Sequence, residues 1–160
     1  MSDNRRELES WTDNQVAAVE VGTAARRALR LLSYDLEPQI YGEQDFIDVV
    51  RSVATSGRFA SVRVLVQDSA RAVRDGHRLV ELARRLPTFI ELRKPHSDHR
   101  SLIEAYLVAD ERALLYRKQA DRYEGFVDVD DPLQARRLVR EFDQVWGRAT
   151  PDPELRRLGL

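Results

Sequence analysis

The stretch IEAYLVADERALLYRK, residues 103 to 118, decides the fold. It contains two short apolar segments, EAYLVAD and RALLYR, which meet at the polar pair Asp110 and Glu111. Apolar runs of this length with a polar junction favour two strands joined by a turn. The stretch therefore predicts a hairpin that carries a charged end at Arg117 and Lys118.

The segments before this hairpin alternate between helical and strand patterns. Strands are predicted over residues 28 to 34 and 61 to 67, and again in the run TFIELRK. Helices are predicted from Asp13 or Asn14, through the run GEQDFIDVVRSVATSG, and over about residues 69 to 86 with an interruption near Gly76. Such alternation is typical of an α/β domain.

The segments after the hairpin complete this pattern. The run GFVDVD predicts a last strand, and Asp131-Pro132 opens a final helix that ends near residue 149. We expect one α/β domain over residues 13–150, with a mixed β-sheet and helices on both faces. Residues 1–12 and 151–160 are polar chain ends, for which we expect a flexible N-terminus and a frayed tail.

Composition excludes several classes of protein. With 42% apolar and 33% charged residues the chain is globular, and a net charge of −1 argues against coating nucleic acid or membranes. Because cysteine is absent, disulfides, thiol catalysis and the usual structural zinc sites are excluded. No apolar run approaches the roughly 20 residues that cross a bilayer. We expect a soluble cytoplasmic protein.

The three histidines give little support for metal or cofactor chemistry. His96 and His99 lie with Asp98 in the run HSDH, which supplies only part of a metal-ligand set. His77 either caps a helix or faces solvent. The sequence has no GxSxG, glycine-rich phosphate loop or HExxH motif. We therefore expect no metal and no cofactor.

Charged residues near the hairpin form the candidate binding site. Arg112, Arg117, Lys118 and Arg122 make a basic group that could hold a phosphate or an acidic partner if the side chains converge, and a solvated surface if they do not. Asp110, like other acids that follow strands here, suits either a ligand site or a structural turn. The predicted ligand-binding set is Asp110, Arg117, Lys118 and Arg122, with His77 and His99 nearby.

Four passages resemble one half-unit of the phospholipase D-like fold over about residues 24 to 148. They are ARRALRLLSYDLEP, ASVRVLVQD, IEAYLVADERALLYRK and YEGFVDVDDPLQARRLVREFDQVW. The family's strand pair runs His-x-Lys, four residues, then Asp. With Asp110 as the aspartate, Ile103 and Ala105 occupy the histidine and lysine positions.

The resemblance implies a histidine nucleophile and a lysine that binds phosphate oxygens. Neither isoleucine nor alanine can take these roles, and starting from His99 instead would place Ser101 and Tyr106 at the next two positions. We therefore predict a degenerate half-unit, a pseudoenzyme without phospholipase D catalysis.

Two further passages, YDLEPQIY and GHRLVELARRL, resemble a small bacterial domain of unknown function that occurs alone or attached to acetyltransferases. This resemblance implies an acetyltransferase as a candidate partner, while the resemblance to a single phospholipase D-like half-unit implies a homodimer. We expect a non-catalytic domain that binds a protein partner or an anionic, phosphate-containing ligand. The alternative is a phosphodiesterase or nuclease that combines His77 or His99 with Asp68 or Asp110. Nucleic-acid binding stays open, although no helix-turn-helix pattern is present.

Overall fold

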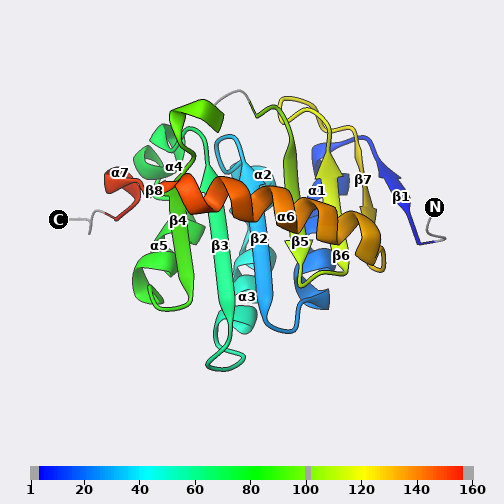
Figure 1. The fold of residues 1–160 in the computed structure, drawn as a ribbon, viewed down its shortest axis with the longest axis horizontal. Helices are drawn as coiled ribbons and strands as arrows, with labels where there is room; N and C mark the ends of the chain where they lie inside the picture. The colour runs from blue at the N-terminus through cyan, green and yellow to red at the C-terminus, as the bar shows by residue number, and fades with distance from the viewer. Residues whose placement is uncertain (1–3, 100–101, 157–160) are drawn as a thin grey trace.

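The computed structural model describes residues 4–99 and 102–156, which form a mixed sheet with helices on both faces (Figure 1). In the described part the strand order is β1-β7-β6-β5-β2-β3-β4-β8. The strands are β1 (Arg6–Leu8), β2 (Ala28–Ser33), β3 (Ser61–Val66), β4 (Ile90–Lys94), β5 (Ala105–Ala109), β6 (Ala113–Arg117), β7 (Gly125–Asp128) and β8 (Thr150–Pro151). Strands β2, β3 and β4 are parallel, and the other pairs are antiparallel. The predicted α/β class is confirmed.

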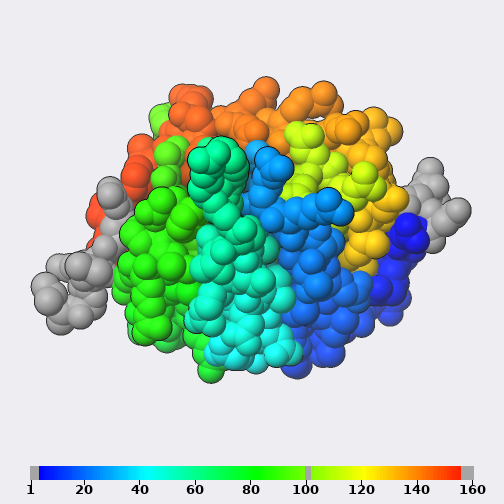
Figure 2. Space-filling view, turned by 90° about the horizontal axis from the view of Figure 1, so that it is seen from below, coloured from blue at the N-terminus to red at the C-terminus, as the bar shows by residue number. Residues whose placement is uncertain are grey.

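The helices lie in two layers: α6 crosses one face of the sheet in Figure 1, and in Figure 2 its orange atoms lie on the side of the molecule opposite the blue and cyan segments. Helices α1, α3 and α5 pack on the opposite face. The described helices are α1 (Trp11–Ala24), α2 (Pro38–Tyr41), α3 (Gln44–Ala54), α4 (Ala70–Arg74), α5 (Arg78–Arg85), α6 (Pro132–Arg148) and α7 (Pro153–Arg156), with a 3₁₀ turn at Ser97–His99.

Alternation along the hairpin strands explains the two layers. Side chains on a strand point to opposite faces in turn, so a strand buried on both faces is apolar throughout. In β5, Leu107 belongs to the core beneath α1 and α3, whereas Tyr106 and Val108 belong to the core beneath α6. Phe142 and Trp146 of α6 stack within that second core, with ring centroids 5.8 Å apart.

The hairpin register separates the two charged ends of the quoted stretch. Ala105 lies opposite Arg117, and Ala109 lies opposite Ala113. Asp110 makes the turn with a φ of 54°, a left-handed conformation that aspartate tolerates better than most residues. Asp110 and Arg117 therefore lie at opposite ends of the strand pair.

Both chain ends are more structured than predicted. Arg6–Leu8, expected to be flexible, form β1 on the edge of β7, where the Arg6 guanidinium pairs with Glu20. Ser10 caps α1 and makes a reciprocal capping box with Asp13, so the helix begins before the predicted Asp13 or Asn14. The polar composition of residues 1–12 gave no sign of β1, because this strand is stabilised by its pairing with β7.

The expected frayed tail also contains structure. Thr150–Pro151 pair with β4, and Leu155 of α7 is buried. The predicted interruption near Gly76 is confirmed, because α4 and α5 are separated there and Gly76 has a φ of 62°.

Candidate functional site

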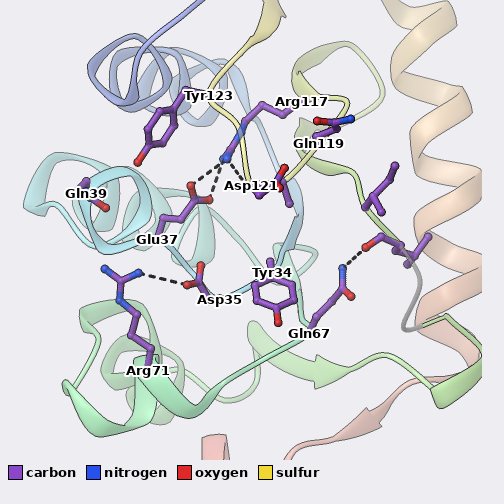
Figure 3. Close-up of a pocket in the computed structure, with 13 residues that line it drawn as sticks. Tyr34, Asp35, Glu37, Gln39, Gln67, Arg71, Arg117, Gln119, Asp121 and Tyr123 are labelled. Carbon is purple, nitrogen blue, oxygen red and sulfur yellow. Dashed lines mark hydrogen bonds and ion pairs between the residues drawn. The ribbon is translucent and has the colours of Figure 1, made fainter.

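A cavity of about 720 Å³ opens beyond the ends of β2 and β3, beside the start of β5 (Figure 3). We call it the strand-end pocket. In open α/β sheets, ligands commonly bind beyond the carboxyl ends of parallel strands. The pocket is lined by Tyr34, Asp35, Glu37, Gln39, Gln67, Arg71, Leu102, Ile103, Arg117, Gln119, Ala120, Asp121 and Tyr123.

A strained turn after β2 positions two carboxylates in this pocket. Leu36 is buried with a φ of 55°, a left-handed conformation that is unfavourable for a residue with a Cβ and no polar side chain to stabilise it. The Leu36 amide donates to Oγ of buried Ser33 at 2.9 Å, which holds the turn in place. The residues on either side, Asp35 and Glu37, pair with two different arginines.

Arg117 is the buried charge of the strand-end pocket, with 1% of its surface exposed. Its two terminal nitrogens lie 2.8 and 3.0 Å from the carboxylate oxygens of Glu37, and its Nε donates to the Arg122 carbonyl at 2.7 Å. The Ala120 carbonyl accepts another bond, and the Tyr123 ring lies 5.6 Å away. Burial lowers the pKa of Arg117, but the hydrogen bonds to Glu37 and the charges of Glu37, Tyr41 and Tyr123 together outweigh it and raise the pKa overall. The guanidinium is thus a permanent cation whose N–H donors are mostly used within the fold.

The second arginine of the pocket is also paired. Arg71 donates to Asp35 at 3.3 Å, as Figure 3 shows. Gln67 donates its side-chain amide to the Leu102 carbonyl at 2.8 Å. Within the described residues, the exposed Asp121 has neither an ion pair nor a hydrogen bond from its side chain. The charge left uncompensated in the pocket is therefore negative.

Of the two positions that the sequence resemblance singled out, Ile103 and Ala105, only Ile103 is among the residues that line this pocket. Ile103 is 61% exposed on the lining, and Ala105 is buried at the start of β5. Among the described lining residues there is no histidine and no lysine.

The predicted set of ligand residues is not brought together. Asp110, at the far end of the hairpin, accepts hydrogen bonds from the backbone amides of Arg26, Arg27 and Ala28 at 2.9, 3.2 and 3.0 Å. It occupies a structural turn far along the strands from Arg117. Asp110 therefore does not share one binding surface with Arg117, which corrects the expectation from the sequence.

Lys118 and Arg122 follow Arg117 but are exposed and do not line the strand-end pocket. Sequence reasoning missed Arg71 and Gln67, which line it. The available signal was that both lie just after the carboxyl end of β3, beside the end of its parallel neighbour β2.

His77 and His99 lie in different environments. His77 is 7% exposed and caps α5, because its Nδ1 accepts from the Leu79 amide at 3.0 Å. His99 ends the 3₁₀ turn. Within residues 4–99 and 102–156, no hydrogen bond or ion pair joins either histidine to Asp68 or Asp110.

The described part of the chain contains no group of three or more His, Cys, Asp or Glu side chains placed to hold a metal ion. It also contains no helix with the length and apolarity needed to cross a membrane.

Solved structures with this architecture include a phospholipase D family member and an archaeal chromatin protein that binds DNA. TrmBL2, an archaeal chromatin protein, has a TM-score of 0.64 and 14% identity over 94% of this chain, which spans about half (54%) of TrmBL2. Nuc from Salmonella typhimurium, a phospholipase D family member, has a TM-score of 0.62 and 10% identity, covering 92% of this chain and 98% of Nuc. NucT from Helicobacter pylori has a TM-score of 0.64 and 9% identity, with the same coverage.

These similarities establish the phospholipase D-like fold predicted from the sequence. No curated protein matches the chain in sequence. The model of a family described as a domain of unknown function, DUF7931, matches residues 10–158. Because this match covers almost the whole chain, the protein belongs to the DUF7931 family.

Proposed function

We propose that this chain is a non-catalytic phospholipase D-like domain that binds a protein partner through the strand-end pocket. One observation carries the proposal. Ile103 exposes 61% of its surface on the pocket lining. The resemblance to the phospholipase D-like motif puts Ile103 at the histidine position and Ala105 at the lysine position. An exposed aliphatic side chain beside a cavity suits contact with another protein better than attack on phosphorus.

The charges of the pocket favour a protein over an anionic ligand. Arg117 and Arg71 are paired with Glu37 and Asp35, so binding an anion there would require the arginines to exchange partners. Asp121 leaves an uncompensated negative charge on the lining. Three glutamines with exposed or partly exposed amides offer donors and acceptors for a peptide backbone, namely Gln39, Gln67 and Gln119.

A second copy of the chain is the first partner to test, and the resemblance adds an acetyltransferase as another. We expect light scattering at micromolar concentration to give the mass of a dimer. Ile103→Asp should shift the protein to monomer because it adds charge to the apolar contact. Leu133→Asp is the matched control, since Leu133 is 80% exposed on α6 and is not among the residues lining the pocket. A monomeric native protein would reject the homodimer.

The absence of catalysis is tested separately with bis(p-nitrophenyl) phosphate and with single- and double-stranded DNA. We expect no hydrolysis above buffer. Turnover that disappears in His77→Asn or His99→Asn would replace this proposal with the phosphodiesterase or nuclease alternative.

A further inference from the structure

A second, smaller cavity of about 180 Å³ lies at the start of α5. It shares the lining residue Arg71 with the strand-end pocket. We call it the α5 pocket. Its lining comes from the turn after β2, the α2–α3 junction and the α4–α5 turn. The lining residues are Leu36, Pro38, Gly42, Arg71, Ala72, Asp75, Gly76, His77 and Arg78.

His77 presents a buried hydrogen-bond donor to this cavity. Because Nδ1 accepts from the Leu79 amide, the proton of the neutral ring lies on Nε2. The side chain is 7% exposed, and Nε2 has no hydrogen-bond partner in the described structure. The Leu36 carbonyl acts as a hydrogen-bond acceptor that raises the pKa of His77, but its distance and angle leave Nε2 without a well-formed hydrogen bond. A buried polar atom without a well-formed hydrogen bond can accept a partner such as water or a bound anion.

Gly42 keeps the space in front of Nε2 open. A Cβ atom added at Gly42 would lie 3.3 Å from the His77 Nε2 atom and 2.9 Å from the Pro38 carbonyl oxygen. The ring nitrogen therefore faces the side of the glycine that has no side chain. Any other residue there would narrow the cavity.

The charges around the α5 pocket are mainly positive. Arg71 and Arg78 line it, and both lower the pKa of His77 through their charge. Arg78 makes only one long hydrogen bond, to the Gly42 carbonyl at 3.4 Å. Asp75 is the acidic residue of the lining and is paired with Arg74 at 3.3 Å. The amino end of α5 adds partial positive charge, since helix N-termini attract anions.

We propose that the α5 pocket binds a small oxyanion, specifically a phosphate group, with His77 Nε2–H and the Arg78 guanidinium as its donors. Arg71 lines both pockets and is held by Asp35, so it supplies charge from the side. The group is free inorganic phosphate or the terminal phosphate of a small monoester. Arg71 therefore links the two pockets, but neither proposed donor, His77 or Arg78, lines the strand-end pocket.

The test is calorimetric titration of the full chain with inorganic phosphate and with glycerol phosphate, using sodium acetate as the comparison anion. Arg78→Gln removes a charged donor from an exposed position and should weaken phosphate binding by about tenfold or more. His77→Asn keeps a side chain that caps helices well but removes the Nε2 donor, and should weaken binding similarly. Arg85→Gln, at the other end of α5, makes the same charge change away from the pocket and should bind like the native chain.

The outcomes separate cleanly. Binding that both pocket variants weaken and Arg85→Gln preserves supports the site, and the tighter of the two phosphate probes identifies its source. No heat of binding at millimolar phosphate overturns the proposal. Equal binding by Arg78→Gln and the native chain, or equal binding of acetate, also overturns it. If His77→Asn does not fold, the comparison of Arg78→Gln with Arg85→Gln still decides.

Discussion

Each end of the β5–β6 hairpin carries a charged side chain that is held by hydrogen bonds within the fold, and the two charges have opposite sign. At one end the Asp110 carboxylate accepts from three backbone amides, and at the other the Arg117 guanidinium donates to Glu37 and two backbone carbonyls. Both charged groups make their hydrogen bonds to other parts of the protein. They differ in burial, because Asp110 is only half-buried whereas Arg117 is 1% exposed.

The difference shows that a charge at a strand end indicates a ligand only when its hydrogen bonds are unfilled. Arg117 lines a pocket and still has almost no free donors. His77, which caps a helix, retains a free donor that faces a cavity.

The largest effect is expected for Arg117→Met. It leaves the Glu37 carboxylate, 14% exposed, without its cation, and such a loss destabilises by about 3–5 kcal/mol. Urea unfolding followed by circular dichroism measures the change. Lys118→Met is the neighbouring control on an exposed side chain and should change stability little. Equal effects at the two positions would show that the Arg117 pair contributes nothing.

A smaller effect is expected for Asp110→Leu. The substitution leaves three backbone amides without their acceptor, at a cost of about 1–3 kcal/mol, limited because water reaches the turn. Asp110→Asn keeps an acceptor and tolerates the left-handed turn, so it should lose less. The same unfolding experiment applies. A loss larger than that of Arg117→Met would reverse the order proposed for the two ends.

A third test uses the pH dependence of stability. Arg117 should stay charged near neutrality because its pKa is raised, so it should not contribute to this dependence. Burial lowers the pKa of His77, with Arg71 and Arg78 adding to the effect and Leu36 and Asp35 opposing it. The unfolded chain therefore binds a proton near pH 6.5 that the folded chain refuses, so stability falls as pH decreases below that value. The urea midpoint measured from pH 8 to 5 should show this loss. His77→Asn should flatten the profile, and an unchanged slope would argue against it.

The smallest effect is expected for Ile103→Ser. The side chain is largely exposed, so the free energy of unfolding should change by less than about 0.5 kcal/mol. The proposed dimer should nevertheless weaken, as light scattering would show. Large destabilisation of the monomer would mean that Ile103 belongs to the core and not to a binding surface.

The fold was predictable because the informative residues act locally. The apolar runs of β2, β3 and β5, the proline at the start of α6 and the break at Gly76 each show a period or a turn preference in the sequence. The N-terminal strand β1 was not predictable from the sequence. Its first two residues, Arg6 and Glu7, are charged and exposed, and its conformation depends on pairing with the distant strand β7.

The site was less predictable, because pairing between distant residues decides it. Arg117 and Glu37 are far apart in the sequence, and nothing in either passage indicates that they meet. Asp110 and Arg117 are close in sequence, yet the register of an antiparallel pair places them at opposite ends. The turn at Leu36 likewise depends on the hydrogen bond to Ser33 and on burial. The conformational preference of leucine alone would not predict its positive φ.

The position of β1 has a consequence for the order of folding. Arg6 pairs with Val127, so the first strand of the chain has no partner until the residues of β7 are available. Contacts between such distant residues form late, because closing a long loop costs entropy before the contact contributes. We expect the central strands β2 and β3, which are neighbours in the chain, to form first. The sheet is then completed when its earliest-made strand joins one of its last.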